Sequence, residues 1–225
     1  FAVSNGARII NISLWVLWDE EGISKIRNAM NRHAANGTVF VLGAGNDGQR
    51  LDESRHKQEH HLQKTELPNV AVVAAANSEG KPWMGENAGT SFGDRWVRLA
   101  ARGEGVTTAG SGSDENSYFV TEKGTSIAAP NLGAVMARCR LLDEGLSASQ
   151  LIQILDATSD LQSEWESKVS AGGPINEARA IRLAAITGMV RRGKSPEQAF
   201  AQLGIDSAQG DRLMQLARLV SANAD

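Results

Sequence analysis

The heptapeptide Gly124-Thr-Ser-Ile-Ala-Ala-Pro130 opens a helical pattern that continues to about Leu142. Its serine follows a glycine turn and lies in the first turn of the predicted helix, where backbone N–H groups and the helix dipole favour nearby negative charge. A serine at such a place suits a nucleophile that forms an acyl-enzyme. A simpler interpretation is that Thr125 or Ser126 only caps the helix. The heptapeptide alone leaves both interpretations open.

A second glycine-rich segment, Gly43-Ala-Gly-Asn-Asp-Gly48, follows the apolar run Thr38-Val-Phe-Val-Leu42, which predicts a buried strand. Asn46 would then leave the carboxyl end of a parallel strand, the edge at which such sheets bind ligands. Its amide can donate a hydrogen bond to a developing oxyanion. The same segment is also typical of a turn in which asparagine adopts a left-handed conformation.

The chain around these segments alternates predicted strands with predicted helices. Residues 7–14 and 70–76 are rich in apolar residues and also predict buried strands. Helical spacing of apolar residues from Ile23 to Ala34 separates the first two strands and implies a right-handed parallel crossover. The polar stretch from Gln49 to Glu66 is predicted to be a long loop or insertion. We therefore expect an α/β domain with a mostly parallel sheet.

The C-terminal part of the sequence predicts helices. Ser147-Ala-Ser-Gln150 and Ser195-Pro-Glu-Gln198 have the form of capping boxes, and Asp206-Ser-Ala-Gln209 repeats that signal without the proline. The apolar positions of the tail favour packing on the main domain over binding of a partner; they are Ala199, Leu203, Leu213, Leu216 and Leu219.

Composition excludes several classes of protein. The chain has 225 residues, a net charge of -3 and a mean hydropathy of -0.27, as expected of a globular domain. Lysine and arginine are scattered, so neither nucleic acid nor an anionic membrane is an expected partner. The single Cys139 forbids an intrachain disulfide, and its apolar helical surroundings predict a buried core thiol.

Taken together and in this order, the segments resemble the subtilisin-like serine proteases, the subtilases. Ile10-Asn-Ile-Ser-Leu14 is similar to the family's substrate-binding strand, residues 39–48 to its oxyanion segment, and residues 124–130 to its nucleophile motif. The resemblance also includes residues 67–76 and 173–178, and extends over about residues 5 to 185.

The resemblance implies peptide-bond hydrolysis through an acyl-enzyme. Ser126 would be the nucleophile, and the Asn46 side chain with the Ser126 backbone N–H would hold the oxyanion. The substrate-binding residues that it implies are Ser13, Leu14 and Trp15 along the cleft, Leu42, Gly43 and Ala44 in the first specificity pocket, and Thr125. The implied partner is a peptide or protein substrate.

The sequence departs from the family in its histidines. The family's catalytic Asp and His precede the strand that contains Ile10, and neither has a counterpart in this chain. His33 lies on a predicted helix, and His56, His60 and His61 lie after Asn46. Three explanations stay open: a precursor cut into two pieces that remain together, a fragment without its N-terminal part, and a non-enzymatic homologue. The first makes an N-terminal fragment of the same precursor a partner, and the last makes the chain a peptide-binding or regulatory protein.

The sequence also departs from the family at three further places. Trp15 stands where the family commonly has glycine, Asn131 replaces a frequent histidine at a position interpreted as structural, and Ala101-Arg-Gly103 lacks the proline of the family's Ala-Pro-Gly turn.

We therefore predict a subtilisin-like three-layer α/β fold. Residues 1–185 would form the C-terminal part of a subtilase catalytic domain, and residues 186–225 a helical extension. No cofactor is expected, and no acidic cluster identifies a calcium site of the kind common in the family. The spacing of His56 and His60 would suit a metal on a helix, but a solvated segment is favoured. The resemblance favours a secreted or periplasmic location.

Overall fold

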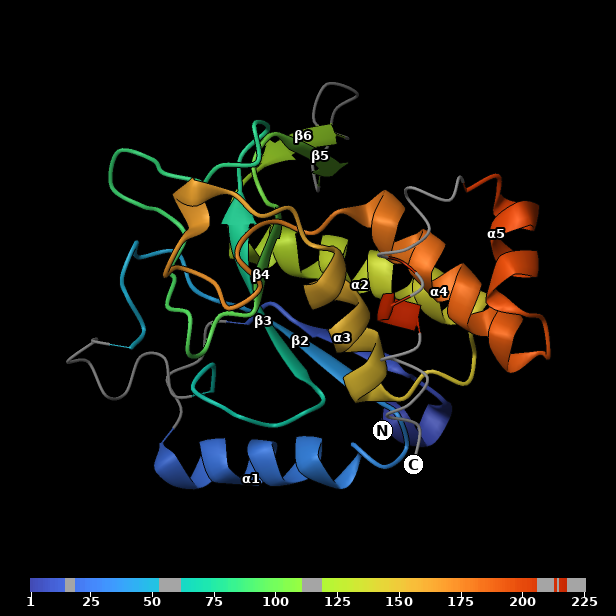
Figure 1. Cartoon of the computed structure of the whole chain (residues 1–225). Helices are drawn as coiled ribbons and strands as arrows, with labels where there is room; N and C mark the ends of the chain where they lie inside the picture. The colour runs from blue at the N-terminus through green and yellow to red at the C-terminus, as the bar shows by residue number, and fades with distance from the viewer. Residues whose placement is uncertain (15–18, 53–61, 111–118, 206–212, 214, 218–225) are drawn as a thin grey trace.

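A parallel sheet forms the centre of the molecule (Figure 1). The computed structural model describes residues 1–14, 19–52, 62–110, 119–205, 213 and 215–217. Among these residues the sheet has four strands in the order β1 (Ile9–Ile12), β2 (Val39–Gly43), β3 (Val70–Ala76) and β4 (Leu99–Arg102), and each neighbouring pair is parallel.

Helices cover both faces of this sheet. Val39 and Val41 of β2 pack toward α2 (Thr125–Leu142), whereas Phe40 and Leu42 pack on the side of α1 (Glu20–Arg32), together with Met30. Both faces of β2 and β3 are buried, which explains why their sequences are continuous apolar runs without alternation. Figure 1 shows α1 on one side of the sheet and α2 on the other. The predicted three-layer α/β fold is therefore confirmed.

Local signals place the helix ends. The side chain of Asp19 caps α1 by accepting from Gly22 N–H over 2.7 Å. Both predicted capping boxes are present, at the starts of α3 (Ala148–Thr158) and α5 (Pro196–Leu203). The remaining elements are the short helices η1 (Val3–Asn5) and η3 (Ser163–Trp165), the helix α4 (Glu177–Arg191), and the antiparallel hairpin of β5 (Val106–Ala109) and β6 (Phe119–Glu122).

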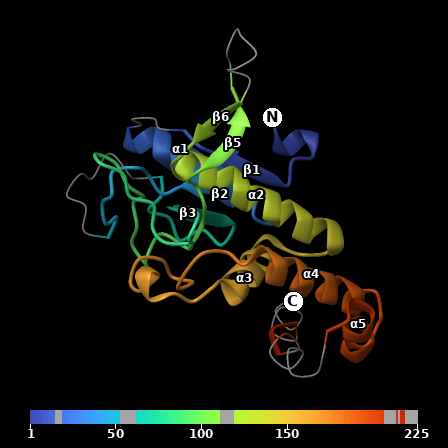
Figure 2. The same cartoon turned by 90° about the horizontal axis from the view of Figure 1, so that it is seen from above.

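The C-terminal helices pack on the α2 side of the core. Figure 2 shows α4 and α5 side by side at one end of the molecule. Ala199 and Phe200 of α5 are buried in the same apolar cluster as α2, and the partly buried Leu203, Leu213 and Leu216 pack against it. The predicted packing of the tail is confirmed for these residues, whereas Leu219 and the signal at 206–209 lie outside the described residues. The predicted domain boundary between residues 185 and 186 falls inside α4, and this boundary stays a prediction.

β1 is the terminal strand of the sheet among the described residues. It pairs with β2 on one side, and its three isoleucines are only partly buried. Ile9 packs with the α2 side of the core, and Ile10 and Ile12 pack with the α1 side. None of the helices among the described residues combines the length and the apolar composition of a membrane span.

Candidate active site

The carboxyl end of β2 and the start of α2 are in direct contact. Gly43 ends β2, and a Cβ atom there would lie 2.9 Å from Thr125 Oγ1 and 3.1 Å from the Thr125 carbonyl oxygen. Only glycine allows the two segments to approach this closely. The predicted oxyanion segment and the predicted nucleophile motif, 79 residues apart at Asn46 and Thr125, are thereby brought together.

Hydrogen bonds to Thr125 fix the orientation of the Asn46 side chain. Asn46 Oδ1 accepts from the Thr125 backbone N–H over 2.9 Å and from Thr125 Oγ1 over 3.1 Å. Thr125 Oγ1 in turn accepts from the backbone N–H of Gly45 over 3.2 Å. Because a backbone N–H can only donate, the oxygen of the amide must face Thr125, and Asn46 Nδ2 is left as a donor. None of the described residues accepts a hydrogen bond from it.

Gly124 makes room for that amide. Its φ of 123° lies in the left-handed region, and a Cβ atom there would lie 3.2 Å from both Nδ2 and Oδ1 of Asn46. The Gly124 N–H donates to the carbonyl of Gly103 over 2.7 Å, and a Cβ on Gly103 would lie only 2.7 Å from the Gly124 carbonyl oxygen. Glycine is therefore required on both sides of this contact.

The backbone N–H of Ser126 remains available at the start of α2. The first four N–H groups of a helix have no acceptor within the helix itself. Here Gly124 donates to Gly103, Thr125 donates to Asn46, and Ile127 donates to the Gly124 carbonyl over 3.1 Å. The Ser126 N–H has no acceptor among the described residues, and the Ser126 side chain is exposed. Two donors, Ser126 N–H and Asn46 Nδ2, thus lie beside an exposed hydroxyl.

The end of β1 also contacts the nucleophile motif. Ser13 Oγ donates to the carbonyl oxygen of Ser126 over 3.0 Å. Leu14, the next residue, is 70% exposed, and Trp15 lies outside the described residues. Of the predicted substrate-binding positions on this side, Ser13 therefore contacts Ser126.

The residues assigned to the first specificity pocket follow β2. The side chains of Leu42 and Ala44 are buried in the core on the α1 side, and the Gly43 carbonyl accepts from Gln63 Nε2 over 3.2 Å. No feature of the sequence indicated the contact made by Gln63. Whether these residues contact a substrate stays a prediction.

The described residues place no histidine at this edge of the sheet. His33 ends α1, and its carbonyl accepts from Thr38 N–H at the amino end of β2, whereas Asn46 follows the carboxyl end of β2. His56, His60 and His61 lie outside the described residues. Among the residues that are described, no three of His, Cys, Asp or Glu gather as a metal site would require.

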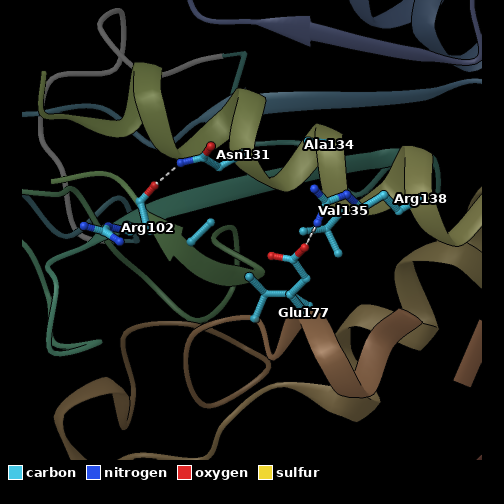
Figure 3. A pocket seen from close by; sticks show the side chains of 8 residues that line it. Arg102, Asn131, Ala134, Val135, Arg138 and Glu177 are labelled. Atoms are coloured by element: carbon cyan, nitrogen blue, oxygen red, sulfur yellow. Dashed lines mark hydrogen bonds and ion pairs between the residues drawn. The ribbon is translucent and has the colours of Figure 1, made fainter. Parts of the chain in front are cut away.

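Cys139 and Asn131 have structural roles in α2. Cys139 is buried, as predicted, and burial raises the pKa of its thiol to about 12, which excludes a thiolate nucleophile near neutral pH. Asn131 stands where the family frequently has histidine, and its Nδ2 donates to the carbonyl of Arg102 over 2.7 Å. Asn131 also lines a cavity of about 300 Å³ in which Arg138 and Glu177 form an ion pair (Figure 3).

Comparison with known proteins agrees with this architecture. Residues 1–210 match the Peptidase_S8 subtilase family. The chain is 34% identical over 135 residues to mouse proprotein convertase subtilisin/kexin type 9, covering 60% of this chain and 18% of that protein. The corresponding rat protein is 33% identical over 143 residues, which are 62% of this chain and 19% of the relative. The chain thus spans under a fifth of the length of these curated relatives.

Solved structures share the fold. The A-subunit of the AB5 toxin from E. coli aligns with a TM-score of 0.65 and 23% identity, over 79% of this chain and 60% of that one. The prenylagaramide maturation protease PagA aligns with a TM-score of 0.59 and 24% identity, over 80% of this chain and 63% of that one. At these identities the structures support the fold alone. The match of the family over nearly the whole chain establishes more: this chain belongs to the subtilase family, a family of serine proteases.

Proposed function

We propose that this chain provides the nucleophile and the oxyanion hole of a serine endopeptidase that cleaves peptide bonds through an acyl-enzyme. The observation that carries the proposal is the pair of donors beside Ser126. Asn46 Nδ2 and the Ser126 N–H both lack an acceptor among the described residues, and both lie at the start of α2.

In the proposed reaction, Ser126 Oγ attacks the scissile carbonyl and its proton passes to a base. The carbonyl oxygen becomes an oxyanion, which accepts hydrogen bonds from Asn46 Nδ2 and Ser126 N–H. The base then protonates the leaving amine as the peptide C–N bond breaks, leaving an ester on Ser126. Water attacks that ester with the same base as proton acceptor, which releases the acid and restores the hydroxyl.

We propose that the base comes from a polypeptide segment that docks against the open edge of β1. A serine without a base is a weak nucleophile, and His33 lies at the opposite end of β2 from Asn46. Ile9, Ile10 and Ile12 of β1 are only partly buried, although parallel strands are usually covered on both faces. An added parallel strand would cover them and would bring its own carboxyl end to the edge where Ser126 lies.

The other candidate is a subtilase homologue without catalysis that holds an extended peptide in the same cleft. The absence of a histidine beside Ser126 in the described part of the chain favours it. Under this alternative, a peptide would pair with residues 13–15, while Ser126 would never be acylated.

A fluorophosphonate probe separates the two candidates. The purified protein, with every polypeptide that remains bound to it, is weighed intact by mass spectrometry before and after treatment. The protease predicts one added phosphonyl group on Ser126, a companion segment in the same sample, and no label on a Ser126→Ala variant. A single unreactive chain that still binds extended peptides would favour the binding protein.

A further inference from the structure

A proline interrupts the hydrogen bonding of α2 at the predicted nucleophile. In an α-helix each carbonyl accepts from the N–H four residues later. For Ser126 that residue is Pro130, which lies inside α2 and has no N–H. The carbonyl of Ser126 therefore lacks the donor that an α-helix normally supplies four residues later.

Ser13 supplies the missing donor from a distant part of the chain. Its Oγ lies 3.0 Å from the Ser126 carbonyl oxygen, across 113 residues of sequence. Asn11, two residues earlier on the same side of the strand, donates from Nδ2 to Ser13 Oγ over 3.0 Å. The hydroxyl has a single hydrogen and two acceptors within reach, Asn11 Oδ1 at 3.3 Å and the Ser126 carbonyl oxygen at 3.0 Å. The shorter distance and the bond received from Asn11 Nδ2 favour donation to Ser126.

We propose that Ser13 is a positioning residue, whose hydroxyl replaces the helix hydrogen bond that Pro130 removes and so fixes the backbone of Ser126. The reading of Ser126 as a nucleophile rests on the proposed function. The two sides of the motif are then held from two strands. Asn46, after β2, holds the Thr125 N–H, and Ser13, after β1, holds the Ser126 carbonyl. The Ser126 N–H between them stays free for an oxyanion.

A double-mutant cycle on the complete chain tests the replacement itself. Ser13→Ala is made with Pro130 present and in a Pro130→Ala background, where residue 130 regains an N–H for the Ser126 carbonyl. Urea unfolding should show that Ser13→Ala lowers the folding equilibrium constant about threefold to tenfold when Pro130 is present. In the Pro130→Ala background the loss should be less than about twofold, because the helix now makes the bond itself. An equal loss in both backgrounds would overturn the proposal.

A pair of variants of equal shape tests the positioning of the nucleophile. Ser13→Thr keeps a hydroxyl, whereas Ser13→Val removes it. Threonine and valine both favour extended backbone. We expect Ser13→Val to react with a fluorophosphonate about threefold to tenfold more slowly than Ser13→Thr. Equal rates for both variants would show that the hydroxyl does not position Ser126.

The two experiments also separate this proposal from the proposed function. A wild-type protein that never reacts with the probe, but shows the predicted coupling between Ser13 and Pro130 in unfolding, would refute the protease and retain the replaced hydrogen bond. A protein that reacts with the probe but shows no coupling between Ser13 and Pro130 would support the protease and refute the replaced hydrogen bond.

Discussion

The backbone N–H of Thr125 donates to Oδ1 of Asn46 over 2.9 Å, and this bond joins the loop after β2 to the first residue of α2. It orients the amide so that Nδ2 is free to donate toward the Ser126 side. The two atoms of the amide therefore differ in role: Oδ1 accepts from Thr125, and Nδ2 is left as a hydrogen-bond donor.

Asn46→Asp tests that separation. The aspartate keeps the oxygen that accepts from Thr125 but has no N–H to donate, so the variant should remain folded while turnover falls. We expect kcat to fall by roughly 10²–10³, the loss that removal of the oxyanion-hole asparagine causes in subtilisin, a member of this family, with KM little changed. Steady-state kinetics on a peptide substrate measure both. An Asn46→Asp variant with wild-type kcat would exclude Asn46 from the oxyanion hole.

Thr125→Val removes the hydroxyl that links Gly45 to Asn46. The buried Gly45 N–H would lose its acceptor, at a cost of about 1–3 kcal/mol in the free energy of unfolding. Asn46 Oδ1 would lose one of two donors, and we expect kcat to fall about tenfold. Thr125→Ser retains the hydroxyl and is the matched control. Identical stabilities of the two variants in urea unfolding would contradict this account of Thr125.

Gly103→Ala tests the contact between β4 and the start of α2. The added Cβ would lie 2.7 Å from both the Gly124 carbonyl oxygen and Ala75 Cβ, which requires backbone movement. We expect a loss of about 1–3 kcal/mol in the free energy of unfolding. Gly133→Ala, inside α2 with its nearest neighbour at 3.7 Å, should instead stabilise the protein by up to about 1 kcal/mol. Thermal unfolding of both variants measures these changes. A Gly103→Ala variant as stable as the wild-type protein would refute the contact.

Asp156 makes stability depend on pH. Burial raises the pKa of its carboxyl group to about 6, although Arg98 lies 2.9 Å away and opposes the shift. Its Oδ1 is buried and has no hydrogen-bond partner among the described residues. Because the folded protein binds this proton more tightly than the unfolded chain does, the contribution of Asp156 to stability is present below the ordinary aspartate pKa of 3.8 and is lost as pH rises through about 6.

Urea unfolding between these pH values measures that loss, which should not exceed about 3 kcal/mol. Asp156→Asn should flatten the dependence, whereas Glu144→Gln, which removes an exposed carboxylate, should leave it in place. An unchanged pH dependence in Asp156→Asn would assign it to another group.

Much of the fold could be predicted because its signals are local. The apolar runs at 39–43 and 70–76 are buried on both faces, and the capping boxes at Ser147 and Ser195 involve residues only three apart. Short strands are less visible in the sequence. β4 begins at Leu99, where pairing with Val73 sets the register. That pairing depends on a partner elsewhere in the chain.

The contacts around Ser126 could be predicted only in part. The resemblance pointed to Asn46 and to Ser126, and the structure brings them together. It did not show that Gln63 would bond to the Gly43 carbonyl, or that Asn11 and Ser13 would form a chain of hydrogen bonds to Ser126. These are single polar contacts between distant segments, and no spacing in the sequence records them. Pro130 was visible, yet its consequence appears only when the partner of the Ser126 carbonyl is known.

The most direct test of the central claim is to trap the acyl-enzyme. The protein, with any bound companion segment, is mixed with an activated ester, quenched in acid within the first turnover, and analysed by intact mass and peptide mapping. We predict one acyl group, attached to Ser126, and none on Ser126→Ala. Ester hydrolysis that persists in Ser126→Ala, or an acyl group on another residue, would contradict the assignment of Ser126 as the nucleophile.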